Sequence, residues 1–228
     1  MPKETKPKTR KTYEPRLQER RQERASSWTH GIAAVISALC LGPLLVLVAD
    51  KGNARHIVSF SLFGAALIFL FTASTFMHLH RGRGQAKRIF EFLDHAGIYT
   101  VIAATYTPFC LVTLHGAWGW SLFGVIWGLA AVGMSLSLGL GERFNRFGDG
   151  IYLVMGWLIV IAIRPLAAHL PWPGLILLIA GGLAYTIGVV VLTMQRFYYY
   201  HAIWHLFVAL GALLHLLAMV FYVLPDLR

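Results

Sequence analysis

Seven long apolar runs, separated by short polar segments, occupy the chain from residue 29 to residue 224. Each run is about as long as the roughly 20 residues that an α-helix needs to cross the hydrocarbon core of a bilayer. Because a segment in lipid must satisfy its own backbone hydrogen bonds, these runs predict helices. The expected spans are residues 29–49, 56–79, 94–115, 118–140, 150–170, 174–194 and 201–224. The pattern therefore predicts an all-α integral membrane protein, a bundle of seven transmembrane helices.

The composition agrees with this pattern and leaves no room for a sizeable soluble domain. Hydrophobic residues make up 57% of the 228 residues and charged residues 13%, far from the balance of a soluble protein. Residues 25–228 are expected to form a single membrane domain. Residues 1–24 are polar and basic and are expected to form a cytoplasmic tail, disordered to about Tyr13, with a short interfacial helix from Glu14 to Arg24.

The basic residues indicate both the orientation and the partners of the protein. Grouping the N-terminal tail with the loops at 80–93, 141–149 and 195–200 puts sixteen Lys and Arg residues on one side of the membrane and three on the other. Since cytoplasmic loops carry the excess of these residues, the N-terminus is expected in the cytoplasm and the C-terminus outside. The formal net charge of +10 comes largely from residues at the ends of apolar runs, so membrane lipids rather than nucleic acid are the expected partners.

Polar side chains inside the spans gather at one depth. With this orientation, four spans bring ionisable or hydroxyl groups within a few helical turns of the cytoplasmic boundary, whereas random placement would scatter them over both leaflets. These residues are His30, Ser74, His78, Asp94, His201 and His205. Polar groups in lipid are costly, so this layer indicates a functional site. The alternative is that the histidines only hydrogen-bond across helices or face the interface.

The layer contains candidate ligands for zinc. His201 and His205 are four residues apart, so they share one face of a helix, and His78 reaches the same depth from another span. Three imidazoles with water in the fourth position are the arrangement of a catalytic zinc site. Asp94 is expected to hold that water or to orient a ligand. Ser74 lies on the same helical face as His78, where its hydroxyl can bond to a substrate, the water or a carboxylate.

A further histidine of the last run is set apart from this group. His215 follows His205 by ten residues, a rise of about 15 Å along a helix, which is too far to bind the same ion. It is expected to be a packing or hydrogen-bonding residue.

Four motifs, in this order along the chain, resemble those of one known family. They are Glu23 with His30 in Glu-Arg-Ala-Ser-Ser-Trp-Thr-His, Ser74-xxx-His78, Leu93-Asp94-His95-Ala96-Gly97, and His201-xxx-His205. Together they are similar to the motifs of the hemolysin III family, the bacterial branch of the progestin and adipoQ receptor superfamily, which includes the adiponectin receptors. The resemblance covers the chain from about Glu23 to its end.

The resemblance implies a seven-helix bundle in the bacterial plasma (inner) membrane, with a cytoplasmic N-terminus and a bound Zn2+ ion. The eukaryotic relatives resemble alkaline ceramidases in fold and are associated with the hydrolysis of lipid amides. The implied zinc ligands are His78, His201 and His205, with Glu23 and His30 as accessory residues. The chain departs from the family at Ser26, four residues before His30, where Asn is common.

Three functions are compatible with these features. The first is a zinc-dependent hydrolase of an amide or ester of a membrane lipid, in which Asp94 moves a proton and Ser74 stabilises the oxyanion. The alternative is a non-enzymatic sensor or regulator of membrane fluidity or energetics, in which zinc holds the helix bundle together. A pore-forming cytolysin, suggested by the family name, fits less well, because each long apolar run is typical of a constitutive span.

Overall fold

The computed structural model describes residues 10–145, 147–196 and 198–225, and within these ranges the chain forms helices and no strands. The helices are α1 (Arg10–Lys51), α2 (Ala54–Leu79), α3 (Gln85–Pro108), α4 (Gly116–Leu140), α5 (Glu142–Asn145), α6 (Gly148–Trp157), α7 (Ile163–His169), α8 (Trp172–Met194) and α9 (Tyr200–Ala218). Helix α3 continues as a π-helical segment at Phe109–Leu114, α9 continues as another at Met219–Val223, and a 3₁₀ segment at Leu158–Ala162 joins α6 to α7. The described chain is therefore all-α, as predicted.

Seven helical stretches in the described ranges are long and apolar enough to cross a membrane. They agree with the predicted spans to within a few residues, except that the first and the third begin earlier, at Leu17 and Gln85. Large apolar side chains such as Ile36, Leu39 and Val46 are exposed on the outside of the bundle, as expected for a surface in contact with lipid. The prediction of a multi-pass helical membrane protein is confirmed.

Helices α1 and α3 extend beyond the apolar runs of the sequence. Helix α1 runs without a break from Arg10, so residues 10–13 are helical rather than disordered, while residues 1–9 lie outside the described part of the chain. Helix α3 starts inside the segment predicted as a loop, where Lys87 and Glu91, one turn apart, form an ion pair with an N–O distance of 3.9 Å. Hydropathy locates the part of a helix that lies in lipid and not its polar extension.

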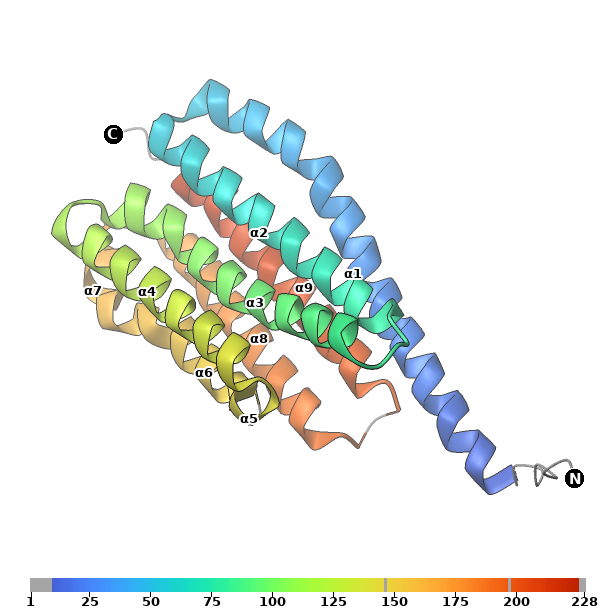
Figure 1. Cartoon of the computed structure of the whole chain (residues 1–228). Coiled ribbons are helices and arrows are strands. Elements are labelled where there is room, and N and C mark those ends of the chain that lie inside the picture. The colour runs from blue at the N-terminus through green and yellow to red at the C-terminus, as the bar shows by residue number, and fades with distance from the viewer. Residues whose placement is uncertain (1–9, 146, 197, 226–228) are drawn as a thin grey trace, which may run out of the picture.

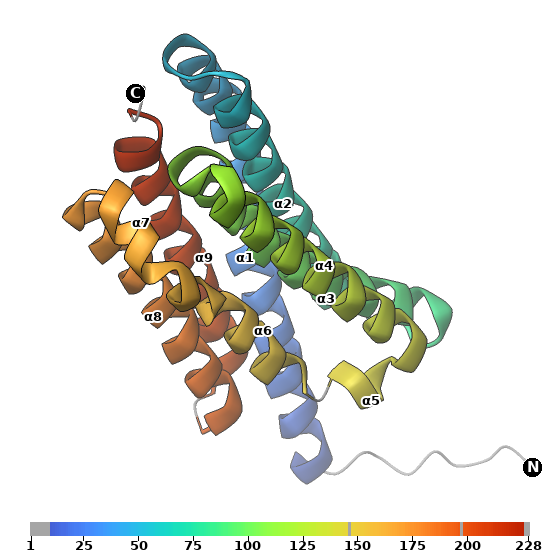
Figure 2. The same cartoon turned by 90° about the vertical axis from the view of Figure 1, so that its left-hand side faces the viewer.

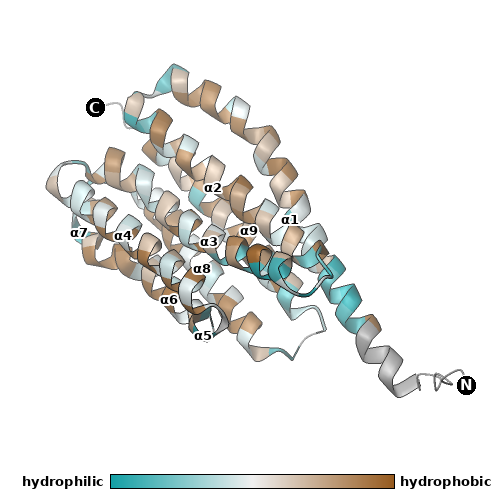
Figure 3. Ribbon diagram, in the orientation of Figure 1, coloured by the Kyte–Doolittle hydropathy of each residue, from teal (hydrophilic) through white to brown (hydrophobic). Residues whose placement is uncertain are grey.

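The spans form one bundle in which neighbours in sequence are mostly neighbours in space. Helix α1 packs against α2 and α9, α2 against α3, α3 against α4, and α8 against α9. The start of α1 and the end of the last helix lie at opposite ends of the bundle (Figure 1, Figure 2). Hydrophilic residues gather in the first coloured turns of α1 and at the connection between α2 and α3 (Figure 3). This end, where α9 also begins, is called the polar end.

Helices α8 and α9 meet along a seam of glycines. Three glycines of α8 are spaced by seven residues, and a Cβ atom on any of them would come closer than 3.0 Å to a side chain of α9 or of its π-helical continuation. The pairs are Gly174 with Tyr222, Gly181 with His215, and Gly188 with Trp204. Small residues at this spacing let two helices approach closely in lipid, so ring side chains of α9 pack directly on the backbone of α8.

A side chain of α3 holds the 3₁₀ segment that follows α6. The hydroxyl of Tyr106 donates to the carbonyl oxygen of Met155 at 2.7 Å and accepts from the backbone N–H of Ile159 at 2.9 Å. In an unbroken α-helix these two backbone groups would bond to each other. The tyrosine hydroxyl is therefore inserted into the hydrogen-bond ladder, which accounts for the break.

Candidate metal centre

Three histidines from two helices form a triangle at the polar end of the bundle. His78 lies in the last turn of α2, and His201 and His205 lie one turn apart at the start of α9. Their ring centroids are 4.8–5.0 Å apart, and one ligand nitrogen from each ring lies within 4.8 Å of the others. His78 and His205 are buried, and His201 is half-buried. The structure thus brings together the three residues singled out by spacing, here called the histidine triad.

The local sequence explains how both helices reach this point. Residues four apart share one face of an α-helix, so His201 and His205 project in the same direction. Helix α2 stays regular through its last turn, where the N–H of His80 donates to the carbonyl of Phe76 at 2.9 Å. His78 is therefore carried by a regular helix and not by the connection that follows.

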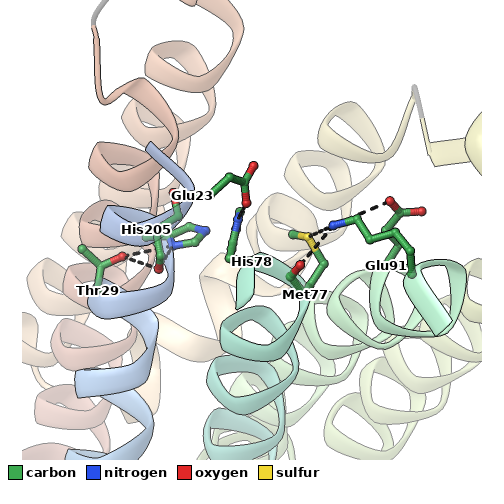
Figure 4. A network of polar contacts seen from close by, with 8 residues as sticks. Glu23, Thr29, Met77, His78, Glu91 and His205 are labelled. Atoms are coloured by element: carbon green, nitrogen blue, oxygen red, sulfur yellow. Dashed lines mark hydrogen bonds and ion pairs between the residues drawn. The ribbon is translucent and has the colours of Figure 1, made fainter. Parts of the chain in front are cut away.

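Helix α1 supplies a carboxylate to His78. Oε2 of Glu23 lies 2.7 Å from Nδ1 of His78 (Figure 4). Because an ionised carboxylate only accepts hydrogen bonds, Nδ1 carries the proton and donates it. Nε2 of His78 is then unprotonated, and it is buried without a hydrogen-bond partner among the described residues. Its lone pair is free to bind a metal ion.

Helix α1 also holds His205. Nδ1 of His205 lies 3.0 Å from the carbonyl oxygen of Ser26 and 3.1 Å from Oγ1 of Thr29 (Figure 4). The hydroxyl of Thr29 donates to the same carbonyl at 2.8 Å. Since a carbonyl oxygen only accepts, Nδ1 of His205 carries its proton, and Nε2 has the lone pair. Two members of the triad therefore have fixed tautomers that leave Nε2 as the ligand atom.

The triad fits a metal ion with the preferences of zinc. Imidazole nitrogens bind zinc at about 2.0–2.1 Å, which puts each ring centroid about 3 Å from the ion and, at a tetrahedral angle, about 5 Å from the next ring. The observed spacing of 4.8–5.0 Å agrees. Hydrogen bonds from the second ring nitrogen to a carboxylate or carbonyl are the usual outer contacts of metal-bound histidines. Neutral imidazoles suit zinc, and also copper, iron and nickel.

Asp94 and Ser74 lie beside the triad, on the wall of one cavity that His201 and His205 also line. Within the described ranges, the group at mutual ligand distance consists of the triad alone, so Asp94 is a neighbour of the ligands and not one of them. The hydroxyl of Ser74 is buried and has no hydrogen-bond partner among the described residues. Both residues therefore belong to the wall of the cavity beside the triad.

The cavity extends from the triad into the middle of the bundle. Its volume is about 210 Å³, and residues of α1, α2, α3, α6, α8 and α9 line it. Most of the wall is apolar, with side chains such as Leu70, Ile102, Leu153 and Val208. The arrangement joins a cluster of metal-binding groups to a space suited to a hydrocarbon chain.

His30 stacks on one ligand of the triad. Its ring lies parallel to that of His205, with centroids 3.5 Å apart and an angle of 5° between the planes. His30 is buried, lines the cavity, and has no hydrogen-bond partner at either nitrogen within the described ranges. The first motif thus contacts two ligands, with Glu23 bonded to His78 and His30 stacked on His205.

Sequence reasoning missed the contacts of Ser26 and Thr29 with His205. Ser26 acts through its backbone carbonyl, which every residue has, so the departure from Asn at this position does not remove the hydrogen bond. Thr29 lies three residues after Ser26, on the same face of α1. The sequence signal for this contact was a threonine three residues after Ser26 within the first motif.

The fold and the site define a class of protein: a multi-pass helical membrane protein with three histidines at metal-binding distance near one end of a bundle of seven spans in the described residues. A family model described as Haemolysin-III related matches residues 18–216, which is most of the chain. The chain therefore belongs to the haemolysin-III family of multi-pass bacterial membrane proteins.

Relatives are similar over most of their length. Hemolysin-3 of Bacillus cereus is 39% identical over 207 residues, which cover 90% of this chain and 94% of the relative. The Hemolysin-3 homolog of Bacillus subtilis (strain 168) is 38% identical over 202 residues, covering 89% and 94%. The human monocyte to macrophage differentiation factor is 29% identical over 196 residues, covering 84% and 80%. These matches confirm the family expected from the motifs and are consistent with the progestin and adipoQ receptor superfamily.

Proposed function

We propose that the protein is a zinc-dependent hydrolase of an amide or ester bond in a membrane lipid. The observation that carries this proposal is the cavity that His201 and His205 line together with Asp94 and Ser74. Structural zinc sites are closed by four protein ligands, whereas catalytic sites keep one position open. A triad of ligands at the edge of a cavity leaves that position accessible to a substrate.

The residues beside the triad have the chemistry that hydrolysis needs. A zinc ion held by the triad would supply Lewis-acid polarisation of the carbonyl and activation of water. Asp94 would take a proton from the attacking water and return it to the leaving nitrogen or oxygen. The hydroxyl of Ser74, which has no other partner in the described residues, would donate a hydrogen bond to the developing oxyanion.

The apolar wall of the cavity supports a lipid as the substrate. A hydrocarbon chain that enters about 210 Å³ of mostly apolar space removes its surface from the polar end of the bundle and excludes water from the site. The scissile bond would then lie at the triad, with the chain extending between α3, α6, α8 and α9.

The direct test is the release of fatty acid by purified, zinc-loaded protein from ceramide-like amides and from phospholipid esters. We expect release by the wild type and none by His201→Ala, which lacks one ligand. His169→Ala is the matched control, because His169 is exposed at the opposite end of the bundle and bonds to the carbonyl of Pro165. No release from any of these lipids, with His78→Ala leaving cells unchanged, contradicts the proposal.

Metal analysis tests the ligand assignment separately from turnover. Zinc content is measured in the purified wild type beside His78→Ala and His201→Ala. We expect zinc in the wild type and a loss of most of it in both variants. Equal zinc content in all three proteins would overturn the assignment of the triad.

A second function, a membrane sensor or regulator whose metal holds the bundle together, is favoured by the contacts of α1. Glu23 and Ser26 join α1 to His78 of α2 and His205 of α9. If this function holds, a chelator lowers the melting temperature by about 5–10 °C, since a ligand at a hundred times its Kd adds about 2.7 kcal/mol of stability. Asp94→Asn would then leave the cellular function intact, whereas in a hydrolase it would abolish it.

A further inference from the structure

Two polar side chains in the same cavity have no part in the proposed hydrolysis. His215 of α9 and Tyr185 of α8 both line the cavity. His215 is only 7% exposed, and its Nδ1 is buried without a hydrogen-bond partner among the described residues. The hydroxyl of Tyr185 is also buried and unpartnered within the described ranges. A buried polar atom without a hydrogen bond is costly, so the pair indicates a ligand group that bonds to both.

The hydrogen bond of His215 determines whether its other ring nitrogen is a donor or an acceptor. Nε2 of His215 lies 3.0 Å from the carbonyl oxygen of Leu178, which only accepts, so Nε2 carries the proton. Nδ1 is then an acceptor, while the phenol of Tyr185 can donate. A hydroxyl group on a ligand satisfies both, because it donates to Nδ1 and accepts from the phenol. A carbonyl group on a ligand would bond to Tyr185 alone.

Glycines keep both rings at this place. A Cβ atom on Gly181 would come closer than 3.0 Å to the ring of His215, and one on Gly211 would lie 2.7 Å from the ring of Tyr185. Each ring therefore packs on the bare backbone of the opposite helix. The two ring centroids are 5.6 Å apart, and no hydrogen bond between described atoms joins them. Turning either ring toward another hydrogen-bond partner would remove its packing contact with the opposite helix.

The pair lies far from the triad along the cavity. His215 follows His205 by ten residues of the continuous helix α9, a rise of about 15 Å. With C–C bonds of about 1.5 Å, an extended hydrocarbon chain covers this distance in about twelve carbons. Between the two points, α9 lines the cavity with the apolar side chain of Val208. The cavity thus has polar groups at both ends and an apolar wall between them.

We propose that the cavity binds a long-chain lipid that carries a hydroxyl group on its chain, about twelve carbons from the group at the triad. His215 and Tyr185 are the residues that select this hydroxyl. The inference rests on the proposed function in one respect, since it takes the reacting end of the lipid to lie at the triad. The substrates of that site are then lipids with hydroxylated rather than plain acyl chains.

Tryptophan fluorescence gives a binding test that needs no turnover. Trp157 and Trp204 line the cavity, so a brominated fatty acid bound there quenches their emission. Purified full-length protein is loaded with this probe, and three unbrominated acids of one chain length compete. They are the plain acid, a hydroxy acid with its hydroxyl about twelve carbons from the carboxylate, and a hydroxy acid with its hydroxyl on the carbon beside the carboxylate. We expect only the acid with the distant hydroxyl to bind more tightly than the plain acid, by about tenfold, as one satisfied buried polar site predicts.

Variants separate selection from folding. Tyr185→Phe keeps the ring and removes the hydroxyl, so it should reduce the preference to about threefold or less and leave the plain acid bound as before. His215→Leu should also reduce the preference, and if it fails to fold, Tyr185→Phe still decides the question. Tyr222→Phe is the matched control, because Tyr222 packs on Gly174 in the same seam and does not line the cavity.

Three outcomes overturn the inference: equal affinity of the wild type for all three acids, no displacement of the probe by any acid, or an undiminished preference in Tyr185→Phe. The outcome for the proposed function is read separately. Selective binding without release of fatty acid from any lipid contradicts the hydrolase and leaves the selection of the hydroxyl in place. Hydrolysis without a preference for hydroxylated chains supports the hydrolase and contradicts the selection of the hydroxyl.

Discussion

Glu23 accepts a hydrogen bond from Nδ1 of His78 at 2.7 Å, across the interface between α1 and α2. The contact joins residues 55 positions apart in the sequence and fixes the tautomer of a triad ligand. A carboxylate in this position orients the ring and raises the basicity of the ligating nitrogen, and losing such a partner typically costs about 10–100-fold in metal affinity.

We therefore expect Glu23→Gln to bind zinc about tenfold or more weakly than the wild type, because the amide is uncharged and is a poorer acceptor. Competition with a chelator of known affinity measures this change. Glu19→Gln is the matched control, since Glu19 is an exposed carboxylate one turn earlier in α1. Equal zinc affinity of Glu23→Gln and the control would show that the hydrogen bond does not support the metal.

Replacing the two polar neighbours of the triad should separate catalysis from metal binding. In Asp94→Asn we expect fatty-acid release to fall by about 10²–10⁴-fold, the range for a lost general acid–base group. In Ser74→Ala we expect a loss of about 10²–10³-fold, as for a lost oxyanion donor. Zinc content should match the wild type in both, because neither residue belongs to the triad.

Thr105→Val serves as the control for these two variants. Thr105 also lines the cavity, but its hydroxyl donates to the carbonyl of Val101 within its own helix. Its replacement should leave the rate of release nearly unchanged. If Asp94→Asn and Ser74→Ala retain the activity of this control, the assigned roles are wrong.

The glycine seam predicts opposite effects at two adjacent positions. Gly181→Ala places a methyl group against the ring of His215 and should destabilise the protein by about 1–3 kcal/mol. Gly182→Ala has its nearest neighbour at 3.5 Å, a carbon of Trp157, and should be neutral or stabilising by up to about 1 kcal/mol, since alanine favours helix. Thermal unfolding in one detergent compares the two. A similar melting temperature for both variants would mean that the seam tolerates an added methyl group.

The excess of basic residues at the polar end predicts that this end faces the cytoplasm. The test uses single cysteines at Arg83, in the connection between α2 and α3, and at Lys51, at the end of α1. Both are introduced into a background in which Cys40 and Cys110 are serine. A membrane-impermeant maleimide should label Lys51→Cys in intact cells and Arg83→Cys only after permeabilisation. The reverse labelling would contradict the orientation.

The sequence predicted the spans well because the length of an apolar run is set by the thickness of the bilayer. It placed the start of α3 nine residues too late, at residue 94 instead of Gln85. The first turns of that helix carry the ion pair of Lys87 with Glu91, which a hydropathy profile does not detect. The break after α6 was not predicted either, since it depends on the hydroxyl of Tyr106 arriving from another helix.

The sequence also predicted which histidines meet, because residues four apart on a helix and a shared depth are properties of spacing alone. It did not pair Glu23 with His78 or Ser26 with His205. The first contact depends on how α1 packs against α2, and the second uses a backbone carbonyl, which leaves no trace in the identity of the residue.

The two long walls of the cavity differ in how easily they deform. Along the seam of α8 and α9, a shift of either helix drives a ring such as that of His215 into the opposing backbone at Gly181. Helix α6 lines the other side, and its ladder is already interrupted where Tyr106 stands between Met155 and Ile159. A helix bends at lower cost where a hydrogen bond of its ladder is missing. We therefore expect the wall of the cavity to deform more readily at α6 than along the seam of α8 and α9.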